Sequence, residues 1–470
     1  MTADPPALAG LLATWLPEQR WYAGKGTPLS SLAITAQTVL RAGDPELLHL
    51  IVTVQLTGGP DDGRPRSAVY QIPVGLRRDL PDGLRHAVIG ELPGGVTAYD
   101  ALHDPELSSC LLDGIAAGRQ ADGLVFAREP GAALGRWPGA RVIAAEQSNT
   151  SVVFGEAAIL KVLRRLFPGA NPDLEVAGAL ARLGSVHVAP PYGWIATELA
   201  GKPVLLAVLS KFLAHASDGW SLAAASIARL SALHGEYGRE YLMTPVPQPG
   251  PARPGPGFAD ESLQLGRATA ELHADLATAF GTEQLTKQQL GELAGQLTAK
   301  FEQAAAIVPE LGEFAGKVRS SFADVALLTE PVIVQRIHGD YHLGQVLRTD
   351  DGWVALDFEG EPLVPLAQRT GRYPALRDVA GMLRSFDYAA RHQLLAHPDA
   401  PALREPADAW VTRCQDAFCA GYARAGGLDP ETHSVLLRAL TLEKAVYEVM
   451  YEARHRPSWL AIPLGYIAAA

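Results

Sequence analysis

Short apolar runs separated by turn-forming residues predict β-strands in the first half of the chain. Two such runs lie at residues 48–54 and 68–74, with a cluster of Gly, Pro and Asp between them. Three more lie at 141–144, 151–154 and 158–162, and neighbouring runs are separated by short turns. Single further strands are expected at 123–126 and 204–211.

Helical periodicity becomes the dominant pattern after the last of these strands. A helix rich in Leu and Ala is expected at 172–183, and an amphipathic helix at 376–386. The other helices that the pattern predicts are 8–16, 98–103, 106–119, 258–279, 287–306 and 443–452. We therefore expect an α+β protein with a small N-terminal unit at 1–90, a mixed connecting part at 91–208 and a helical part at 209–470.

The composition is that of a folded protein, and it excludes some classes of function. Hydrophobic residues make up 48% and charged residues 19% of the 470 residues, which argues against general disorder. The net charge of −11 argues against a nucleic-acid-binding surface, which needs a basic stripe. The start lacks the pattern of a signal peptide, and no run of about 18 apolar residues occurs. We expect a cytoplasmic protein without a membrane span, and nothing in the sequence identifies a protein partner.

Two further features are expected to be structural. Cys110, Cys414 and Cys419 have no metal-binding spacing and are expected to be reduced, buried thiols. The segment 244–257 is rich in Pro and Gly and interrupts the helical pattern. Such a composition favours a semi-extended linker.

The most informative residues are three polar side chains in one stretch of the helical part. Asp340 lies in the sequence Ile-His-Gly-Asp-Tyr-His, Gln345 follows it by five positions, and Asp357 follows it by seventeen. Apolar runs before, between and after these residues predict a loop followed by a short hairpin.

This spacing is typical of phosphoryl transfer from ATP. In that chemistry one carboxylate orients or deprotonates the attacking hydroxyl, which is the role expected for Asp340. An amide oxygen and a second carboxylate hold Mg²⁺ on the phosphates, which are the roles expected for Gln345 and Asp357. Glu359 is either a ligand of a second ion or an exposed partner for a basic residue. The sequence therefore predicts an ATP- and Mg²⁺-dependent phosphotransferase.

Candidate nucleotide-binding residues lie in the middle part of the chain. Lys161 lies in an Ile-Leu-Lys-Val strand, and Glu175 follows it by fourteen positions in the next helix. We expect Lys161 to contact the nucleotide phosphates and Glu175 to hold it, with Asp173 as an alternative to Glu175. The other interpretation of Lys161 is an ordinary surface lysine.

A polar turn precedes that strand and occupies the place of a phosphate-covering loop. It contains Ser148, Asn149 and Ser151 but lacks a glycine-rich pattern. Its side chains and N–H groups either contact phosphate oxygens or form an ordinary polar hairpin.

Candidate substrate-binding residues surround the catalytic stretch. His342 either contacts substrate or phosphate or has a structural role, whereas His338 is expected to pack and hydrogen-bond behind the loop. Asp378 either pairs with the catalytic loop or binds sugar hydroxyls. Arg384, a further candidate, lies six positions later and faces another direction.

The last predicted helix carries an acid and two aromatic residues on one face. Glu443, Tyr447 and Tyr451 lie at i, i+4 and i+8. This face suits hydrogen bonding to a sugar and stacking on it, with Glu443 and Tyr447 as the candidate contacts. The alternative is a helix face packed into the core.

These residues resemble the actinobacterial maltokinase-like family of sugar kinases, which is related to aminoglycoside phosphotransferases and more distantly to protein kinases. The matching stretches extend over nearly the whole chain. They are 19–24, 145–152, 171–175, 334–347, 356–362, 376–390 and 444–460.

The resemblance implies a bilobal, protein-kinase-like α+β fold. In this family an N-terminal cap subdomain precedes a mixed, β-rich N-lobe and a helical C-lobe, which would correspond here to 1–90, 91–208 and 209–470. The nucleotide would lie between the lobes, and the sugar in an acidic pocket of the C-lobe.

Two departures from the maltokinase pattern bear on the substrate. Tyr341 stands where maltokinases usually carry leucine, and Gln-Arg-Thr-Gly at 368–371 stands where they tend to carry Glu-Arg-Arg. The chain is also similar to glucosamine kinases, a sister branch, and a cationic amino sugar suits a pocket rich in Asp and Glu.

The resemblance therefore implies phosphorylation of D-glucosamine at its 6-hydroxyl, giving glucosamine 6-phosphate. The alternative is formation of maltose 1-phosphate. A third hypothesis is a catalytically weak, kinase-like sugar sensor, against which the intact set of Lys161, Asp340, Gln345 and Asp357 argues.

Overall fold

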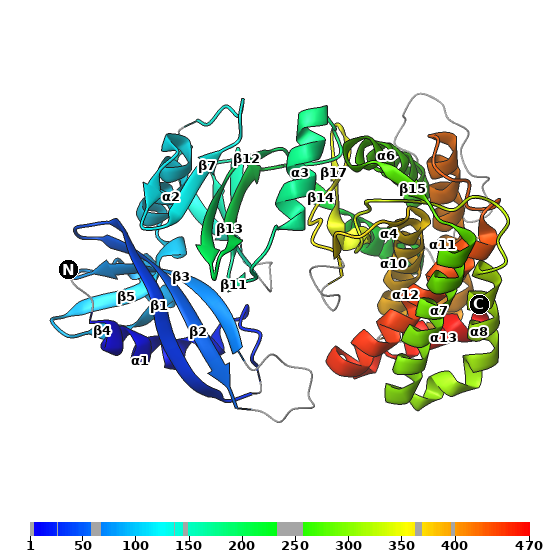
Figure 1. The fold of residues 1–470 in the computed structure, drawn as a ribbon, viewed down its shortest axis with the longest axis horizontal. Coiled ribbons are helices and arrows are strands. Elements are labelled where there is room, and N and C mark those ends of the chain that lie inside the picture. Colours follow the sequence, from blue (N-terminus) through cyan, green and yellow to red (C-terminus); the bar gives the residue numbers. More distant parts are fainter. Residues whose placement is uncertain are drawn as a thin grey trace. The chain divides into compact units, whose positions relative to one another are not determined.

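The structure, a computed structural model, describes residues 4–25, 27–57, 67–135, 137–143, 149–232, 257–361, 369–395 and 400–470. The chain divides into two compact units (Figure 1). The first comprises residues 1–178 and 189–214, and the second comprises 179–188 and 215–470. No helix in the described ranges is both long enough and apolar enough to cross a membrane.

The N-terminal part of the first unit is an antiparallel sheet with a helix packed against it (Figure 1). Helix α1 (Pro5–Trp15) begins with a proline, whose fixed φ suits the first helical turn. Its buried Leu8 and Leu12 pack with apolar residues of the sheet. The order of the strands is β1-β2-β3-β5-β4. The bounds are β1 (Leu29–Arg41), β2 (Glu46–Leu56), β3 (Ser67–Arg77), β4 (Val88–Leu92) and β5 (Val96–Asp100).

A second antiparallel sheet follows, in the order β6-β7-β12-β13-β10-β9-β8. Helix α2 (Pro105–Ala117) packs against it; Asp104 caps its start, and Gly118, in the left-handed conformation, ends it. The bounds of the strands are β6 (Gln120–Ala121), β7 (Leu124–Arg128), β8 (Ala140–Ile143), β9 (Asn149–Phe154), β10 (Ala158–Leu163), β12 (Pro191–Leu199) and β13 (Lys202–Lys211). The short strand β11 (Arg165–Leu166) pairs with β3 of the first sheet, and helix α3 (Pro172–Leu183) comes next.

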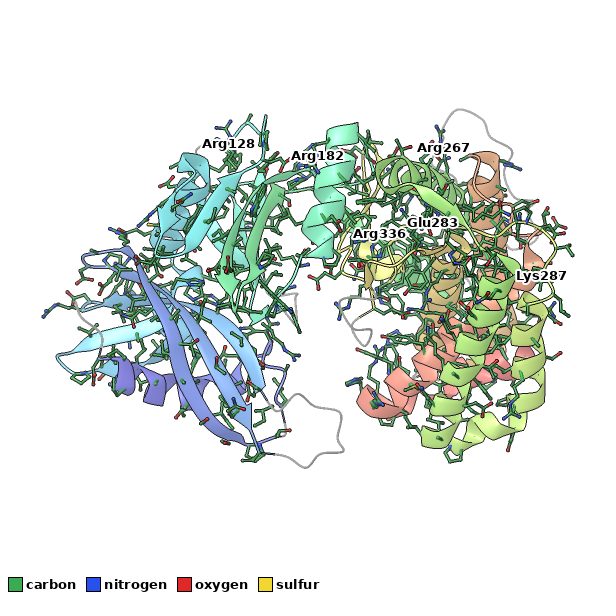
Figure 2. All side chains as sticks on the ribbon, viewed as in Figure 1. Arg128, Arg182, Arg267, Glu283, Lys287 and Arg336 are labelled. Atoms are coloured by element: carbon green, nitrogen blue, oxygen red, sulfur yellow. The ribbon has the colours of Figure 1, made fainter. Side chains whose placement is uncertain are left out.

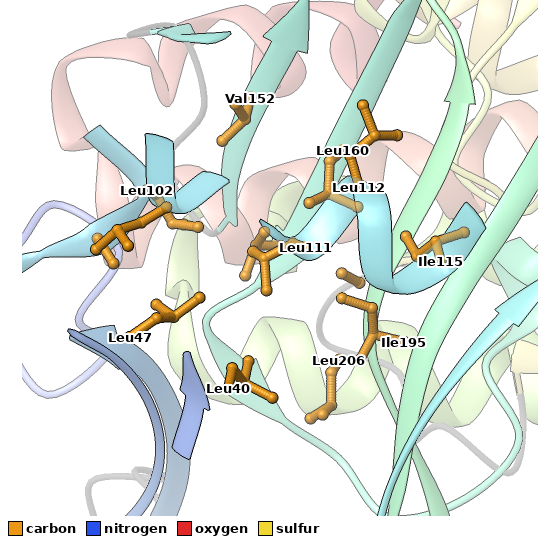
Figure 3. Close-up of a cluster of buried hydrophobic side chains, with 14 of the residues drawn as sticks. Leu40, Leu47, Leu102, Leu111, Leu112, Ile115, Val152, Leu160, Ile195 and Leu206 are labelled. Atoms are coloured by element: carbon orange, nitrogen blue, oxygen red, sulfur yellow. The ribbon is translucent and has the colours of Figure 1, made fainter. Parts of the chain in front are cut away.

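The two sheets of the first unit share one hydrophobic core. Figure 3 shows Leu40 and Leu47 of the first sheet in one cluster with Leu111 of α2 and with Leu160 and Leu206 of the second sheet. Burial of apolar side chains from both sheets in a single cluster stabilises their packing.

Arg164 adds a polar connection between these two sheets. Its side chain is fully buried, its Nε donates to Thr150 Oγ1 at 2.8 Å, and another guanidinium nitrogen donates to Asp100 at the end of β5. The guanidinium also lies over the ring of Trp21 at 4.7 Å. Gln71 of β3 donates to the carbonyl oxygen of Leu163 at 2.7 Å.

The second unit is mainly helical, and α10 lies against α11 and α12. Charged side chains such as Arg267 and Lys287 lie on its surface (Figure 2). Its helices are α4 (Gly219–Ala232), α6 (Phe258–Phe280), α7 (Lys287–Ile307), α8 (Ala315–Val325), α10 (Leu376–Leu394), α11 (Ala400–Arg424), α12 (Ser434–His455) and α13 (Ala461–Ala469). Its strands form two small sheets, β14 (Ser217–Asp218) with β17 (Val346–Thr349) and β18 (Gly352–Ala355), and β15 (Thr282–Gln284) with β16 (Ile333–Gln335) and β19 (Tyr373–Pro374).

Most strands and helices predicted from the sequence are confirmed, but the helix expected at 98–103 is wrong. Residues Val96–Asp100 form β5, and only Ala101–His103 are helical, as a 3-10 turn. The sequence Ala-Tyr-Asp-Ala-Leu has helix-forming residues, but pairing with β3 on one side and β4 on the other outweighs that preference. The long strand β1 was not predicted at all.

Two predicted segments lie largely outside the described residues. These are the Pro-rich segment 244–257, of which only Gly257 is described, and the part of the polar turn that contains Ser148. The three cysteines are free; Cys414 is buried, and Cys110 and Cys419 are half-buried.

Candidate active site

Asp340 lies in a loop after β16, and Asp378 of α10 holds the backbone that leads into it. The Asp378 carboxylate is 1% exposed and accepts hydrogen bonds from the N–H groups of His338 (2.8 Å) and Gly339 (2.9 Å). His273 Nε2 on α6 lies 3.1 Å from the same carboxylate. Gly339 has a φ of 87°, which glycine adopts without strain. The loop is therefore fixed directly before Asp340.

The residue after Asp340 is fixed as well. Tyr341 is buried, and its hydroxyl lies 2.9 Å from Thr269 Oγ1 on α6. Its carbonyl oxygen lies so close to α10 that a Cβ at Gly381 would approach it to 2.6 Å. Only glycine at position 381 allows this contact between helix and loop. The chain thus holds Asp340 from both sides before any substrate binds.

His338 connects this loop to the hairpin that follows. Its Nδ1 accepts from the N–H of Asp340 at 3.3 Å, and its Nε2 lies 2.7 Å from the carbonyl oxygen of Leu356. Its ring packs beside those of Tyr341 and Phe358. This confirms the packing role predicted for His338.

The hairpin of β17 and β18 brings the backbone at Gln345 close to the backbone at Asp357. The N–H of Leu356 donates to the carbonyl oxygen of Gln345 at 2.9 Å, and Asp357 is the next residue. Asp357 has a φ of 65°, a left-handed conformation that is uncommon for residues other than glycine and often found at functional sites. Gln345, Asp357 and Glu359 are all half-buried. Their oxygen atoms are the kind of donors that Mg²⁺ prefers, so this set fits a magnesium site.

Lys444 of α12 contacts Asp340 directly. Its Nζ lies 3.2 Å from Asp340 Oδ1 and 2.9 Å from Glu361 Oε1. Burial raises the pKa of Asp340, but the charge of Lys444 and the nearby His342 and His338 outweigh that effect and lower the pKa. Burial alone would lower the pKa of Lys444, but Glu361 and Asp340 raise it. Both partners are therefore charged near neutral pH.

A cavity of about 230 Å³ adjoins this pair. Gly339 and Tyr341, the neighbours of Asp340 on either side, line it, and so does Lys444. Other charged and aromatic residues that line it are Lys300, Glu361, Arg377, Asp378, Glu443, Tyr447 and Arg454. The cavity is thus polar on several sides and adjoins the candidate catalytic carboxylate.

In the first unit, Lys161 lies in the middle of β10, opposite Ser151 of β9. Residues directly opposite each other in an antiparallel pair point to the same face, so Lys161 shares its face with Ser151 and, two positions on, with Asn149. Lys161 Nζ lies 3.8 Å from Asp173 Oδ2 at the start of α3. This face groups an ammonium with small polar side chains.

The chain is similar over most of its length to two characterised relatives. A glucosamine kinase from Streptacidiphilus jiangxiensis is 33% identical over 339 residues, which are 69% of this chain and 72% of the relative. A glucosamine kinase from Mycolicibacterium smegmatis is 30% identical over 337 residues, 69% of this chain and 78% of that one. The chain belongs to the glucosamine kinase family.

Two further comparisons agree with this glucosamine kinase assignment. A solved structure described as glucosamine kinase in complex with glucosamine, ADP and inorganic phosphate has a TM-score of 0.65 and 26% sequence identity, with 99% of both chains covered. The family model of the maltokinase N-terminal cap domain matches residues 15–104. These findings confirm the expected α+β sugar-kinase fold with an N-terminal cap.

Two candidate sugar-binding residues of this glucosamine kinase family member, Asp378 and Arg384, make buried hydrogen bonds or ion pairs within the protein. The carboxylate oxygens of Asp378 contact His273 and accept hydrogen bonds from the catalytic loop. Pairing with that loop was one of the two interpretations of Asp378 from the sequence. Arg384 is 1% exposed, and its guanidinium donates to Glu448 at 2.8 Å and to Asp387 at 2.7 Å. Arg384 is therefore held in buried ion pairs, whereas Asp378 both holds the catalytic loop and lines the cavity. A sugar contact by either side chain stays a prediction.

The remaining candidates lie where a substrate role is possible. Glu443 and Tyr447 line the cavity, and Arg377 lies 3.1 Å from Glu443. His342 Nε2 lies 3.9 Å from Asp340 Oδ2, and its Nδ1 accepts from the N–H of Gly344. The Tyr447 and Tyr451 rings stack at 6.4 Å.

For the nucleotide, the ion pair seen for Lys161 is with Asp173, whereas Glu175 is exposed. Asp173 and Glu175 therefore both remain candidates for holding this lysine.

Sequence reasoning missed Lys444, although it examined the neighbouring Glu443. Lys444 meets Asp340 across 104 positions of sequence. A lysine beside Glu443 in a helix has no local pattern that marks it, so only the packing of α12 against the catalytic loop could have indicated it.

Proposed function

We propose that this chain is a cytoplasmic, ATP- and Mg²⁺-dependent glucosamine kinase that forms glucosamine 6-phosphate. The two relatives are glucosamine kinases, and the similar solved structure holds glucosamine, ADP and inorganic phosphate. One observation in this chain carries the proposal. Asp340 is fixed from both sides in a loop whose residues Gly339 and Tyr341 line a polar cavity large enough for a small ligand.

The proposed reaction needs one proton acceptor and several charge-neutralising groups. The sugar hydroxyl gives its proton to Asp340 while its oxygen forms a bond to the γ-phosphorus. The bond from that phosphorus to the bridging oxygen of ADP breaks, and ADP leaves with the bonding electrons. Mg²⁺, when bound, neutralises negative charge on the phosphates, and Gln345 and Asp357, with Glu359 as a further candidate, would hold it.

Further residues are candidates for contacts with the phosphates. We assign Lys161 to the phosphate oxygens, with Asp173 keeping it in place. Asn149 and Ser151 share its face and are candidates for further contacts, as is Ser148, which lies outside the described residues.

The alternatives remain testable in one assay. The maltokinase alternative is supported by the match of residues 15–104 to the maltokinase cap family. A kinase-like sensor would bind sugar without turnover.

The decisive experiment is to incubate the purified protein with MgATP and glucosamine, maltose, glucose or an aminoglycoside, and to follow ADP release and identify the product. Glucosamine 6-phosphate formed at far higher kcat/KM than any other product is the expected result. Maltose 1-phosphate as the main product would make the chain a maltokinase, and absence of turnover would favour the sensor.

The role of Asp340 is tested by Asp340→Asn in the same assay. We expect kcat to fall by about 10²–10⁴-fold while binding of ADP is retained, because the amide cannot accept the proton. Asp351→Asn, at an exposed position in the turn between β17 and β18, is the matched control. Turnover close to wild type in Asp340→Asn would refute the assignment.

A further inference from the structure

Lys444 binds the candidate catalytic carboxylate from an element outside the catalytic loop. It lies on α12, and its ammonium contacts Asp340 at 3.2 Å, Glu361 at 2.9 Å and the face of the Tyr447 ring at 4.8 Å. The side chain is 16% exposed. Three groups therefore fix the ammonium, which is an unusual degree of restraint for a lysine side chain with four rotatable bonds.

We propose that Lys444 is a positioning residue that acts through Asp340: it holds Oδ1, so that Oδ2 is presented to the sugar hydroxyl. This inference rests on the proposed function, because it assigns Lys444 a part in the same reaction. The supporting geometry is that the two carboxylate oxygens of Asp340 have different partners. Oδ1 contacts Lys444, while Oδ2 is the oxygen that faces His342 at 3.9 Å.

Glu361 is what keeps this lysine in position. The carboxylate is 6% exposed and binds Lys444 through Oε1, while Oε2 lies 3.5 Å from Arg377. Arg377 in turn contacts Glu443, so positive and negative groups alternate from the cavity wall to Asp340. Without the bond to Glu361, the Lys444 ammonium would lose one of the three groups that fix it beside Asp340.

The charge of Lys444 also has a chemical consequence for Asp340. The titratable groups that act on Asp340 are Lys444 from α12 and His342 and His338 from its own loop, and together they lower its pKa against the effect of burial. A carboxylate with a low pKa is a weak base. It suits a loose phosphoryl-transfer transition state, in which the hydroxyl oxygen is only weakly bonded to the phosphorus and its proton passes to Asp340 as that bond forms.

A competing explanation makes a different prediction. The Lys444 ammonium could be a placeholder that occupies the position of the amino group of the substrate and leaves when glucosamine binds. Removal of Lys444 would then lower the KM for glucosamine. If Lys444 positions Asp340, its removal lowers kcat instead.

The test compares Lys444→Met with Lys444→Arg and with Lys300→Met. Lys300 lines the same cavity but binds Glu443 and not Asp340, so it controls for loss of a positive charge from the cavity wall. ADP binding and thermal unfolding show whether each variant is folded. The readouts are kcat, the KM for glucosamine and the pH profile of kcat/KM.

We expect kcat of Lys444→Met to fall by roughly 10²-fold, since a misplaced catalytic group costs about that much. The acid limb of its kcat/KM profile should move to higher pH, because the adjacent positive charge that lowers the pKa of Asp340 is lost. Lys444→Arg should restore the acid limb and only part of kcat. Lys300→Met should leave the acid limb where it is in the wild type.

Three results would overturn the inference: an unchanged acid limb in Lys444→Met, the same shift in Lys300→Met, or a lower KM for glucosamine with unchanged kcat. These failures differ from failure of the proposed function, in which the wild-type protein itself would not phosphorylate glucosamine. If Lys444→Met does not fold, the kcat and the acid limb of Lys444→Arg still test the inference. A wild-type kcat in Lys444→Arg would exclude a positioning role that depends on geometry.

Discussion

Asp378 offers the sharpest test of how the catalytic loop is held. The change Asp378→Asn keeps the size of the side chain but replaces one carboxylate oxygen by an NH₂ group. At least one of the N–H groups of His338 and Gly339 then loses its acceptor, in a place that is 1% exposed. Burial alone would raise the pKa of Asp378, but His273 and the loop amide lower it, so the charged form is the one that is lost.

The expected loss of stability follows from those bonds. A hydrogen bond to a charged group contributes about 1.5–3 kcal/mol, and an orphaned buried N–H adds to its loss. We expect the free energy of unfolding to fall by about 2–4 kcal/mol, measured by urea unfolding. Because the backbone before Asp340 is then no longer held in place, Asp340 is misplaced and kcat should fall by roughly 10²-fold.

Asp387→Asn separates the two effects. Asp387 is buried on the same helix and accepts from Arg384 at 2.7 Å and from Arg391 at 3.1 Å, without a bond to the catalytic loop. This variant should lose stability while its kcat stays near that of the wild type. Asp378→Asn with wild-type kcat, or both variants with the same loss of kcat, would refute the reasoning.

Two other predictions concern close packing and pH. Gly381→Ala places a Cβ 2.6 Å from the carbonyl oxygen of Tyr341, so we expect a loss of about 1–3 kcal/mol in unfolding free energy together with lower kcat; wild-type values of both would contradict this. His49 is buried against Gln71, and burial lowers its pKa, so the unfolded chain takes up a proton at higher pH than the fold does. Stability should therefore be complete above about pH 6.5 and decrease below it by up to about 1.4 kcal/mol per pH unit, and His49→Gln should reduce this slope in urea unfolding at pH 5 to 7.

The parts of the site that could be predicted are those that depend on local sequence. Asp340, Gln345 and Asp357 lie on one loop and one hairpin, so their spacing alone indicated their arrangement. Lys161 was recognised because its strand and the following helix are short, regular and adjacent. Their chemical roles remain proposals.

The parts that could not be predicted depend on contacts between distant segments. Lys444 reaches Asp340 only because α12 packs near the loop, and the close contact of Gly381 with Tyr341 likewise depends on packing between α10 and the loop. Strand β1 was missed for a similar reason: its exposed positions are mostly small or polar, and its pairing with β2 is what makes it a strand.

The buried Arg164 has a consequence for any attempt to shorten or recombine this protein. Its counter-charge, Asp100, and its aromatic cover, Trp21, both come from the segment that matches the cap family, while Arg164 itself directly follows the strand of Lys161. With the cap in place, loss of Asp100 alone would leave the Arg164 cation buried without its counter-charge, and removal of one member of such a pair costs about 3–5 kcal/mol. A cap exchanged between homologues must therefore bring a matching acid with it, so the two segments cannot be treated as interchangeable modules.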